Sequence, residues 1–222
     1  MSQDLWDSVD GYIHEKLLAD DRALEETLKA SEAAGLMPIA VSPSQGKMLH
    51  LLAKLRGAQR ILEIGTLGGY SSLWMAKALP PGGKLITLEI DPKAAQVARA
   101  NFKRAGLEKV IELKLAPALD SLKQLVQEKA PAFDMVFIDA DKPGYPDYLS
   151  WSLKLSRVGT LFILDNMVRK GEIVTAPEGD ERVIGARKTY ELIAKEPRLD
   201  ATDIQTVGLK GHDGFVMALV VS

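Results

Sequence analysis

One stretch, residues 60–91, constrains the fold more than any other part of the chain. It begins with the short apolar run Ile61–Ile64, passes through a glycine turn at residues 65–69, and reaches a second apolar run at residues 84–90. Between them, residues 70–79 have helical spacing that a Pro-Pro-Gly-Gly sequence ends. This order of strand, glycine turn, helix and strand predicts the first β-α-β unit of a nucleotide-binding sheet.

The glycine turn lacks the spacing of a dinucleotide site. Its glycines are Gly65, Gly68 and Gly69, whereas a pyrophosphate bound at a helix N-terminus calls for Gly-x-Gly-x-x-Gly. Glu63 would repel a pyrophosphate and attract a ligand ammonium, and Glu89, at the end of the second strand, can take both hydroxyls of a ribose. S-adenosylmethionine, which has an ammonium, a sulfonium and a ribose but no phosphate, fits this pattern. Glycines that serve only strand-to-helix packing are the alternative.

Composition narrows the class of protein further. The chain has 222 residues, which suits a single domain over residues 1–222, and a net charge of −2 that gives no basic field for nucleic acid or an anionic membrane. It has no cysteine, which excludes disulfides, thiolate metal sites and a cysteine nucleophile. The acidic N-terminus does not resemble a signal peptide, and no apolar run approaches a membrane span. We therefore expect a cytoplasmic protein.

Hydrophobic periodicity predicts an α/β protein with a doubly wound, Rossmann-like, mostly parallel seven-stranded sheet and an antiparallel C-terminal strand. The short link at residues 208–213 forces the last two strands into an antiparallel hairpin. Two helices within residues 3–34 do not belong to the sheet, and we expect the segment 1–45 to cap the site or contact a second subunit. The expected strands are 61–64, 84–90, 110–115, 133–140, 157–165, 203–207 and 214–221, and the later helices 45–55, 92–105, 119–128, 145–156 and 180–196.

Acidic residues follow two of the predicted strands at the point where each ends. Asp139 follows one strand, and Asp165 and Asn166 follow the next. Because neighbouring parallel strands end at the same edge of a sheet, three oxygen ligands are expected to converge beside the cofactor. Such a set suits a hard cation, Mg²⁺ first, with Mn²⁺ or Ca²⁺ possible. Acidic residues that only cap the turn after a strand are the alternative.

Lys142 follows the acidic cluster closely in sequence. A partly desolvated lysine beside a divalent cation has a lowered pKa and can act as a general base. Its alternative is a salt bridge to Asp141 or Asp147.

Three motifs together resemble a known enzyme family. They are LEIGTLGGYS at residues 62–71, FIDADKPGYPDY at residues 137–148 and LDN at residues 164–166. From Val41 to Val221 the chain resembles the cation-dependent class I O-methyltransferases, which include the catechol and caffeoyl-CoA O-methyltransferases, and within them the bacterial branch. The resemblance implies methyl transfer from S-adenosylmethionine to a hydroxyl of a catechol-like small phenolic molecule, by a homodimer.

The resemblance also implies a role for individual residues. Asp139, Asp165 and Asn166 match the metal ligands, and Lys142 matches the catalytic base. The positions that match contacts to S-adenosylmethionine are Val41, Glu63, Gly65, Ser71, Glu89, Ala118, Asp141 and Tyr148. The chain departs from the family where the plant enzymes have a Trp-Asn pair, because Arg169 and Lys170 stand there.

Other interpretations of the sequence predict a different acceptor or a different reaction. A nicotinamide-dependent reductase shares the strand-helix alternation but not the glycine spacing. A methyltransferase of a hydroxylated tRNA nucleoside would use a local basic rim formed by Arg169, Lys170, Arg182 and Arg187. A non-catalytic cofactor-binding protein would not need the Asp-Asp-Asn set with Lys142. For the acceptor pocket itself, we expect walls from residues 1–45 and from the loop 167–179.

Overall fold

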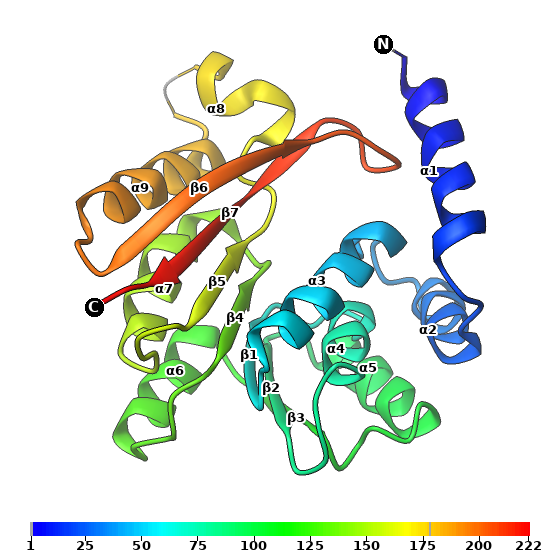
Figure 1. Cartoon of the computed structure of the whole chain (residues 1–222), viewed down its shortest axis with the longest axis horizontal. Coiled ribbons are helices and arrows are strands. Elements are labelled where there is room, and N and C mark those ends of the chain that lie inside the picture. The colour runs from blue at the N-terminus through cyan, green and yellow to red at the C-terminus, as the bar shows by residue number, and fades with distance from the viewer. Residues whose placement is uncertain (1, 178) are drawn as a thin grey trace.

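The computed structural model describes residues 2–177 and 179–222. Met1, in the predicted N-terminal segment, and Glu178, in the predicted pocket loop, lie outside the described residues. A seven-stranded sheet in the order β3-β2-β1-β4-β5-β7-β6 forms the centre of the molecule (Figure 1). The strands are β1 (Arg60–Ile64), β2 (Lys84–Glu89), β3 (Ile111–Leu115), β4 (Met135–Ile138), β5 (Leu161–Leu164), β6 (Leu199–Thr206) and β7 (Asp213–Val220). Only β7 runs against its neighbours, which confirms the predicted fold.

Helices cover both faces of this sheet (Figure 1). The α-helices are α1 (Gln3–Leu17), α2 (Arg22–Ala33), α3 (Pro43–Arg56), α4 (Tyr70–Ala76), α5 (Pro92–Arg104), α6 (Ala118–Gln127), α7 (Tyr145–Leu153), α8 (Glu172–Thr175) and α9 (Glu181–Lys195). Short 3-10 helices, η1 (Lys142–Gly144) and η2 (Arg169–Gly171), precede α7 and α8. None of the helices in the described ranges is both long and apolar enough to cross a membrane.

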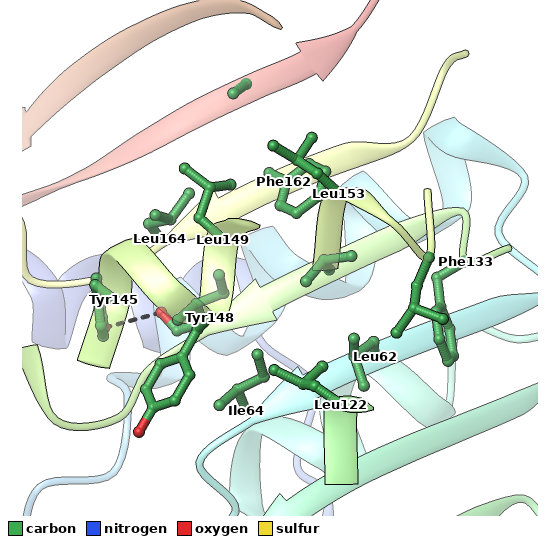
Figure 2. Packing of buried hydrophobic residues seen from close by; sticks show 14 of the residues in the cluster. Leu62, Ile64, Leu122, Phe133, Tyr145, Tyr148, Leu149, Leu153, Phe162 and Leu164 are labelled. Atoms are coloured by element: carbon green, nitrogen blue, oxygen red, sulfur yellow. Dashed lines mark hydrogen bonds between the residues drawn. The ribbon is translucent and has the colours of Figure 1, made fainter. Parts of the chain in front are cut away.

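Alternate residues of each parallel strand point to opposite faces, so the sheet separates two hydrophobic clusters. On β1, Leu62 and Ile64 join the cluster under α6, α7 and α9, whereas Ile61 joins the cluster under α3, α4 and α5. Figure 2 shows the first cluster, in which Tyr145 and Tyr148 of α7 lie among aliphatic side chains from the strands. The buried strands therefore hold their carboxyl ends in fixed positions relative to one another.

Several boundaries differ from the predicted ones. Helix α3 begins at Pro43 rather than residue 45, because the Ser42 side chain accepts a hydrogen bond from the Gln45 backbone N–H and caps the helix there. Strand β6 begins at Leu199 rather than residue 203. It is an edge strand with mostly exposed side chains, so it lacks the apolar alternation by which a strand is recognised. The short helix α8 was not predicted.

The two N-terminal helices differ in how they are attached. Helix α2 packs on α5 and α4 and buries Leu24 and Thr27. Helix α1 buries none of its residues and leaves Leu5, Val9 and Tyr12 exposed. It is held instead by polar contacts to the link between β6 and β7, in which Gln3 and Asp10 take part. The figure shows α1 standing at the periphery of the molecule (Figure 1).

Candidate active site

All the predicted site residues lie at or beyond the carboxyl edge of the sheet, apart from Val41, which precedes α3. The strand order reverses between β1 and β4, and this switch point is where ligands bind in doubly wound sheets. Glu63 and Gly65 mark the end of β1, and Glu89 ends β2. The candidate metal ligands follow β4 and β5, which pair in register.

Gly65 allows the ends of β1 and β4 to approach closely. Its backbone has a φ of +98°, and a Cβ atom there would lie 1.9 Å from the carbonyl oxygen of Asp139. A second glycine of the turn, Gly69, has a φ of +84°, and a Cβ there would meet the ring of Phe102. These two glycines are therefore required by the backbone path and by packing.

Glu63 is completely buried at the end of β1. The hydroxyl of Ser71 donates a 2.6 Å hydrogen bond to it, and the hydroxyl of Ser72 donates a second. Burial raises the pKa of Glu63 to about 7, against the lowering effect of these hydroxyls. In residues 2–177 and 179–222 no cationic side chain hydrogen-bonds to Glu63, so this buried carboxylate is suited to receive the ammonium group of a ligand.

Glu89 organises the backbone on both sides of the same edge. One carboxylate oxygen accepts hydrogen bonds from the N–H groups of Thr66 and Leu67 in the glycine turn, at 3.2 and 2.8 Å. The other accepts from the N–H groups of Ile90 and Asp91, at 2.8 and 2.9 Å. The carboxylate is thereby fixed at the mouth of the turn, where it can accept further bonds from ligand hydroxyls.

Four other predicted cofactor contacts lie around this edge. The hydroxyl of Tyr148 donates a 2.5 Å hydrogen bond to Asp141, so these two residues act together. Val41 is buried and faces the same cavity as Asp165 and Asn166. Ala118 is the first residue of α6, beyond β3. Within the described part of the chain, no hydrogen bond or ion pair joins Ala118 to the other predicted residues.

The structure brings Lys142 together with the candidate metal ligands. Its Nζ lies 3.8 Å from Asp139 Oδ1 and 3.4 Å from Asn166 Oδ1. Lys142 and Asp165 are nearly inaccessible, with exposed fractions of 6% and 4%. The predicted alternative, a salt bridge from Lys142 to Asp141 or Asp147, is not formed among the described residues.

The charges in this cluster oppose one another. Burial raises the pKa of Asp139 and of Asp165. The charge of Asp139 raises the pKa of Asp165 further, and the charge of Asp213 raises that of Asp139. Burial lowers the pKa of Lys142, against the raising effect of Asp139. A buried carboxylate, Asp165, and a partly exposed one, Asp139, lie beside one buried amine, and an additional cation would reduce the repulsion between them.

The donor set at this point fits a hard divalent cation. The carboxylates of Asp139 and Asp165 and the amide oxygen of Asn166 are all oxygen ligands, which Mg²⁺ prefers. Residues 2–177 and 179–222 contain no group of three or more His, Asp or Glu side chains suited to a metal. The candidate site therefore has three protein ligands only if the amide oxygen of Asn166 is counted. Three protein ligands leave positions for water or a substrate.

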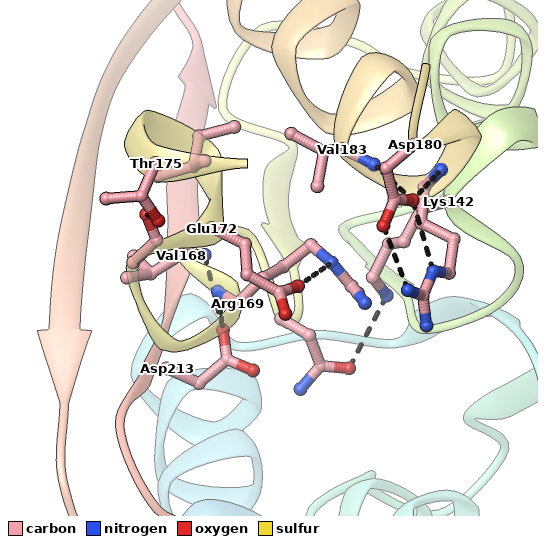
Figure 3. Close-up of polar contacts among 12 residues, drawn as sticks. Lys142, Val168, Arg169, Glu172, Thr175, Asp180, Val183 and Asp213 are labelled. Carbon is pink, nitrogen blue, oxygen red and sulfur yellow. Dashed lines mark hydrogen bonds and ion pairs between the residues drawn. The ribbon is translucent and has the colours of Figure 1, made fainter. Parts of the chain in front are cut away.

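The backbone after Asp165 takes an unusual path. Asn166, Arg169 and Lys170 have positive φ values of 52°, 54° and 56°, a conformation that non-glycine residues rarely adopt. Asp213, at the start of β7, holds this segment by accepting hydrogen bonds from the N–H groups of Val168 and Arg169 (Figure 3). The segment then turns into η2, where Arg169 lies 3.7 Å from Glu172. This anchoring fixes the position of Asn166.

A cavity of about 410 Å³ opens beside Asp165 and Asn166. Its walls come from residues 38–48, as expected in part, and from the tip of the β6–β7 hairpin, residues 206–215. None of the described residues of the expected loop, 167–177 and 179, lines this cavity, so the part of the loop in an acceptor pocket stays a prediction. The hairpin tip carries no motif and was missed from the sequence.

Sequence reasoning also missed residues inside the site. Gln45 lines the cavity, and its side chain lowers the pKa of Asp165 by hydrogen bonding. Ser72 is the second hydroxyl on Glu63, and only the adjacent Ser-Ser pair in the glycine motif pointed to it. Tyr145 contacts Lys142 from a fully buried position. Its i+3 spacing from Lys142 was the only signal for it.

Known proteins are similar to this chain in sequence and share its fold. A protein-family model described as O-methyltransferase matches residues 14–219. A catechol O-methyltransferase from Niastella koreensis is 47% identical over 220 residues, which cover 99% of this chain and 100% of that protein. The structure of an O-methyltransferase from Bacillus cereus in complex with SAH is 51% identical, with a TM-score of 0.97 over 99% of this chain and 100% of that one. The O-methyltransferase TomG from Streptomyces achromogenes, in complex with SAM, is 46% identical, with a TM-score of 0.96 and full coverage of both chains.

The doubly wound sheet with its antiparallel β7 and its acidic carboxyl edge defines a class I methyltransferase. The chain belongs to the O-methyltransferase family and is an S-adenosylmethionine-dependent O-methyltransferase. The predicted family, fold and methyl donor are thereby confirmed, and the alternative of a nicotinamide-dependent reductase was wrong. The glycine spacing had already disfavoured it.

Proposed function

We propose that this enzyme methylates one hydroxyl of a small catechol-like phenol, with a divalent cation bound at the site and Lys142 as the base. The observation that carries the proposal is the position of Lys142. Its amine is buried within 4 Å of two of the three candidate metal ligands, and one of these, Asn166, lines a cavity of about 410 Å³. A volume of this size suits a small-molecule ligand. The relative from Niastella koreensis, named a catechol O-methyltransferase, supports the same acceptor class.

Lys142 is suited to remove the proton from the reacting hydroxyl. Burial lowers the pKa of its ammonium, so a larger fraction is the neutral amine that can accept a proton. The proton moves from the acceptor oxygen to Lys142 Nζ, and the oxygen then attacks the methyl carbon as the carbon–sulfur bond of S-adenosylmethionine breaks. The reaction needs no covalent enzyme intermediate, so the protein acts mainly by holding the two reactants in line.

Asp139, Asp165 and Asn166 would hold the cation, for which Mg²⁺ is the first candidate and Mn²⁺ or Ca²⁺ are alternatives. When bound, such a cation supplies Lewis-acid stabilisation of an acceptor oxyanion. Adjacent hydroxyls on the acceptor are the feature that distinguishes a chelating substrate from a simple phenol. The Asp-Asp-Asn oxygen set and the opposed charges around it support this assignment.

The methyl donor is proposed to lie along the carboxyl edge from β1 to β4. Glu63 would bind its ammonium, and Glu89 its ribose hydroxyls. The other proposed contacts are Val41, Gly65, Ser71, Ala118, Asp141 and Tyr148. The Tyr148–Asp141 pair and the buried Glu63–Ser71 pair support the placement, because each presents a fixed polar group at that edge.

Methyl transfer from S-adenosylmethionine to caffeate tests this function, with Mg²⁺ and with excess EDTA. Turnover that EDTA abolishes is the expected result. A matched pair of variants locates the site: Asp139→Ala is expected to lose metal-dependent turnover, whereas Asp147→Ala, in the same motif but outside the cluster, is expected to keep it. Full Mg²⁺-stimulated activity in Asp139→Ala would show that the ligand assignment is wrong.

A hydroxylated tRNA nucleoside is the second acceptor class that the sequence left open. Three residues of the basic rim foreseen for it are engaged within the protein. Arg182 pairs with Asp180, and Arg187 donates to the carbonyl oxygen of Ile173. Arg169 lies near Glu172 (Figure 3). These contacts favour the small acceptor. Methylation of bulk tRNA without turnover of catechols would reverse this preference.

We further propose that residues 1–222 form one catalytic domain and that the enzyme is a cytoplasmic homodimer. The exposed apolar side chains Leu5, Val9 and Tyr12 of α1 support a subunit contact through this helix. The absence of cysteine fits a reducing compartment. Sedimentation of the purified enzyme, with Tyr12→Ser as the variant, would test the dimer.

A further inference from the structure

Tyr145 is completely buried at the start of α7, and the reaction as proposed uses no atom of it. Its hydroxyl nevertheless lies where three parts of the site meet. It is 2.5 Å from Lys142 Nζ, 3.0 Å from the carbonyl oxygen of Ile138 and 3.1 Å from that of Asp165. One hydroxyl thus joins the proposed base to the ends of β4 and β5.

The donors and acceptors around the Tyr145 hydroxyl determine in which direction each of its hydrogen bonds runs. A tyrosine hydroxyl has one proton to donate and can also accept. Two backbone carbonyls, of Ile138 and Asp165, compete for that proton. A carbonyl cannot donate, so the N–H that the hydroxyl oxygen accepts comes from Lys142. The strand ends therefore orient the Tyr145 oxygen, and that oxygen in turn orients the amine.

The other polar contacts of Lys142 Nζ are much longer. They are 3.3 Å to the carbonyl oxygen of Ala140, 3.4 Å to Asn166 Oδ1 and 3.8 Å to Asp139 Oδ1. The amine also lies 4.2 Å from the centroid of the Tyr145 ring. Tyr145 is consequently the strongest constraint on the end of this side chain.

The backbone of Lys142 is constrained independently, from the other side. Gly185 of α9 packs so closely that a Cβ atom there would lie 2.1 Å from the Lys142 carbonyl oxygen. Because the Lys142 backbone is held against α9, the position of its amine depends on the rotatable bonds of the side chain. The hydroxyl and ring of Tyr145 restrict these bonds at the amine end.

We propose that Tyr145 is the positioning residue for the base, holding Lys142 Nζ beside the cluster formed by Asp139, Asp165 and Asn166. The proposal rests on the function proposed above, in which Lys142 takes the acceptor proton. Tyr145 itself is completely buried and does not line the cavity, so it is assigned no contact with the acceptor. Proton transfer requires the base within hydrogen-bond reach of the hydroxyl, so an unrestrained amine spends less time in the reactive position.

Tyr145→Phe is the test variant, because it removes the hydroxyl and keeps the ring under the amine. At saturating Mg²⁺ and S-adenosylmethionine, kcat for a catechol is expected to fall by about 10- to 100-fold. The KM for the acceptor and the Kd for S-adenosylhomocysteine are expected to stay within about twofold. Tyr190→Phe is the matched control, since it removes a half-buried hydroxyl that donates to Asp203 outside the site, and it is expected to retain kcat.

A double-mutant cycle separates positioning from a general structural role. If Tyr145 acts through Lys142, the variant Lys142→Ala/Tyr145→Phe is no slower than Lys142→Ala alone. A further fall as large as that caused by Tyr145→Phe in the wild type would overturn the proposal. A Tyr145→Phe defect that excess Mg²⁺ restores would also overturn it, because the hydroxyl would then act through Asp165.

The two proposals fail in different ways. If Lys142→Ala keeps its kcat, the base assignment is wrong, whatever Tyr145 does. If Lys142→Ala loses activity while Tyr145→Phe stays within twofold of wild type, the positioning proposal alone is wrong. Should Tyr145→Phe not fold, 3-fluorotyrosine at position 145 keeps the shape and weakens the oxygen as an acceptor. A several-fold lower kcat is then expected, and an unchanged kcat would overturn the proposal.

Discussion

The hydroxyl of Ser71 donates a 2.6 Å hydrogen bond to Glu63, and this bond joins the first turn of α4 to the end of β1 inside the protein. Glu63 is completely buried, and burial raises its pKa to about 7. The carboxyl group proposed to bind the ammonium of S-adenosylmethionine therefore changes its charge close to neutral pH. Both the affinity for the cofactor and the stability of the enzyme should therefore depend on pH near neutrality.

Affinity for S-adenosylhomocysteine is expected to fall as the pH decreases below about 7. In the free enzyme Glu63 is neutral below this pKa and ionised above it. An ammonium ligand favours the ionised form, so binding below pH 7 must release a proton, and affinity should drop about tenfold per pH unit. Calorimetry between pH 5.5 and 8.5 measures this directly. An affinity that stays constant across this range would contradict the role of Glu63.

Glu63→Gln should stabilise the cofactor-free enzyme at pH 8 but not at pH 5. A carboxyl group whose pKa is raised on folding, here from 4.5 to about 7, contributes stability that is present at low pH and lost as the pH rises through 7. The gain over wild type between these two pH values should be about 2–3 kcal/mol. Denaturant unfolding at both pH values measures it. If the variant and the wild type differed in stability by the same amount at pH 5 and pH 8, this would contradict the ionisation of a buried Glu63.

The metal ligands can be tested without an activity assay. Mg²⁺ is expected to raise the Tm of the wild-type enzyme, since a cation that binds only the folded state stabilises it by about 2.7 kcal/mol at 100 times its Kd. Asp165→Asn should abolish this shift. In EDTA the same variant should be at least as stable as wild type, because it removes a buried charge that the like charge of Asp139 disfavours. Asp200→Asn, on the exposed edge strand β6, is the control.

Gly65→Ala should destabilise the enzyme by more than about 3 kcal/mol, through both a positive φ and overpacking. The added Cβ atom would lie 1.9 Å from the carbonyl oxygen of Asp139. Gly57→Ala is the matched control, because Gly57 also has a positive φ but has open space around it. It should cost only about 1–2 kcal/mol. Equal losses for the two variants would show that the approach of β1 to β4 is not tight.

The acceptor cavity depends on contacts between segments about 200 residues apart. Asp10 of α1 accepts a 2.8 Å hydrogen bond from the Leu209 N–H, and Lys210 donates to the carbonyl oxygen of Pro38. Asp10→Ala should therefore loosen the hairpin tip and raise the acceptor KM several-fold, while the Kd for S-adenosylhomocysteine stays unchanged. Glu15→Ala, on the same helix, is the control. An unchanged KM would mean that the hairpin tip holds its position alone.

The sheet and its carboxyl edge were predictable because their signals are local. Apolar runs such as Ile61–Ile64 and the glycines after them each specify one element, and parallel pairing then brings Asp139 and Asp165 to the same edge. Asp91 and Pro92 marked the start of α5 in the same way, through capping and a fixed φ.

The cavity wall and Tyr145 were not predictable, because their signals are not local. The link between β6 and β7 reaches the cavity only through contacts with α1 and Pro38, and nothing in its own composition shows this. In the sequence, Tyr145 looks like one more apolar residue of α7. Its proposed role depends on the carbonyl groups at the ends of β4 and β5, which no pattern of side chains reveals. Strand β6 was shortened because its side chains are exposed.

Methyl transfer from S-adenosylmethionine to caffeate, with Mg²⁺ and then with excess EDTA, tests the central claim most directly. The account predicts turnover with Mg²⁺, none with EDTA, and recovery when Mg²⁺ is restored in excess. Turnover that EDTA does not affect would contradict the cation site at Asp139, Asp165 and Asn166. Absence of turnover by an enzyme that still binds S-adenosylhomocysteine would contradict the catechol-like acceptor.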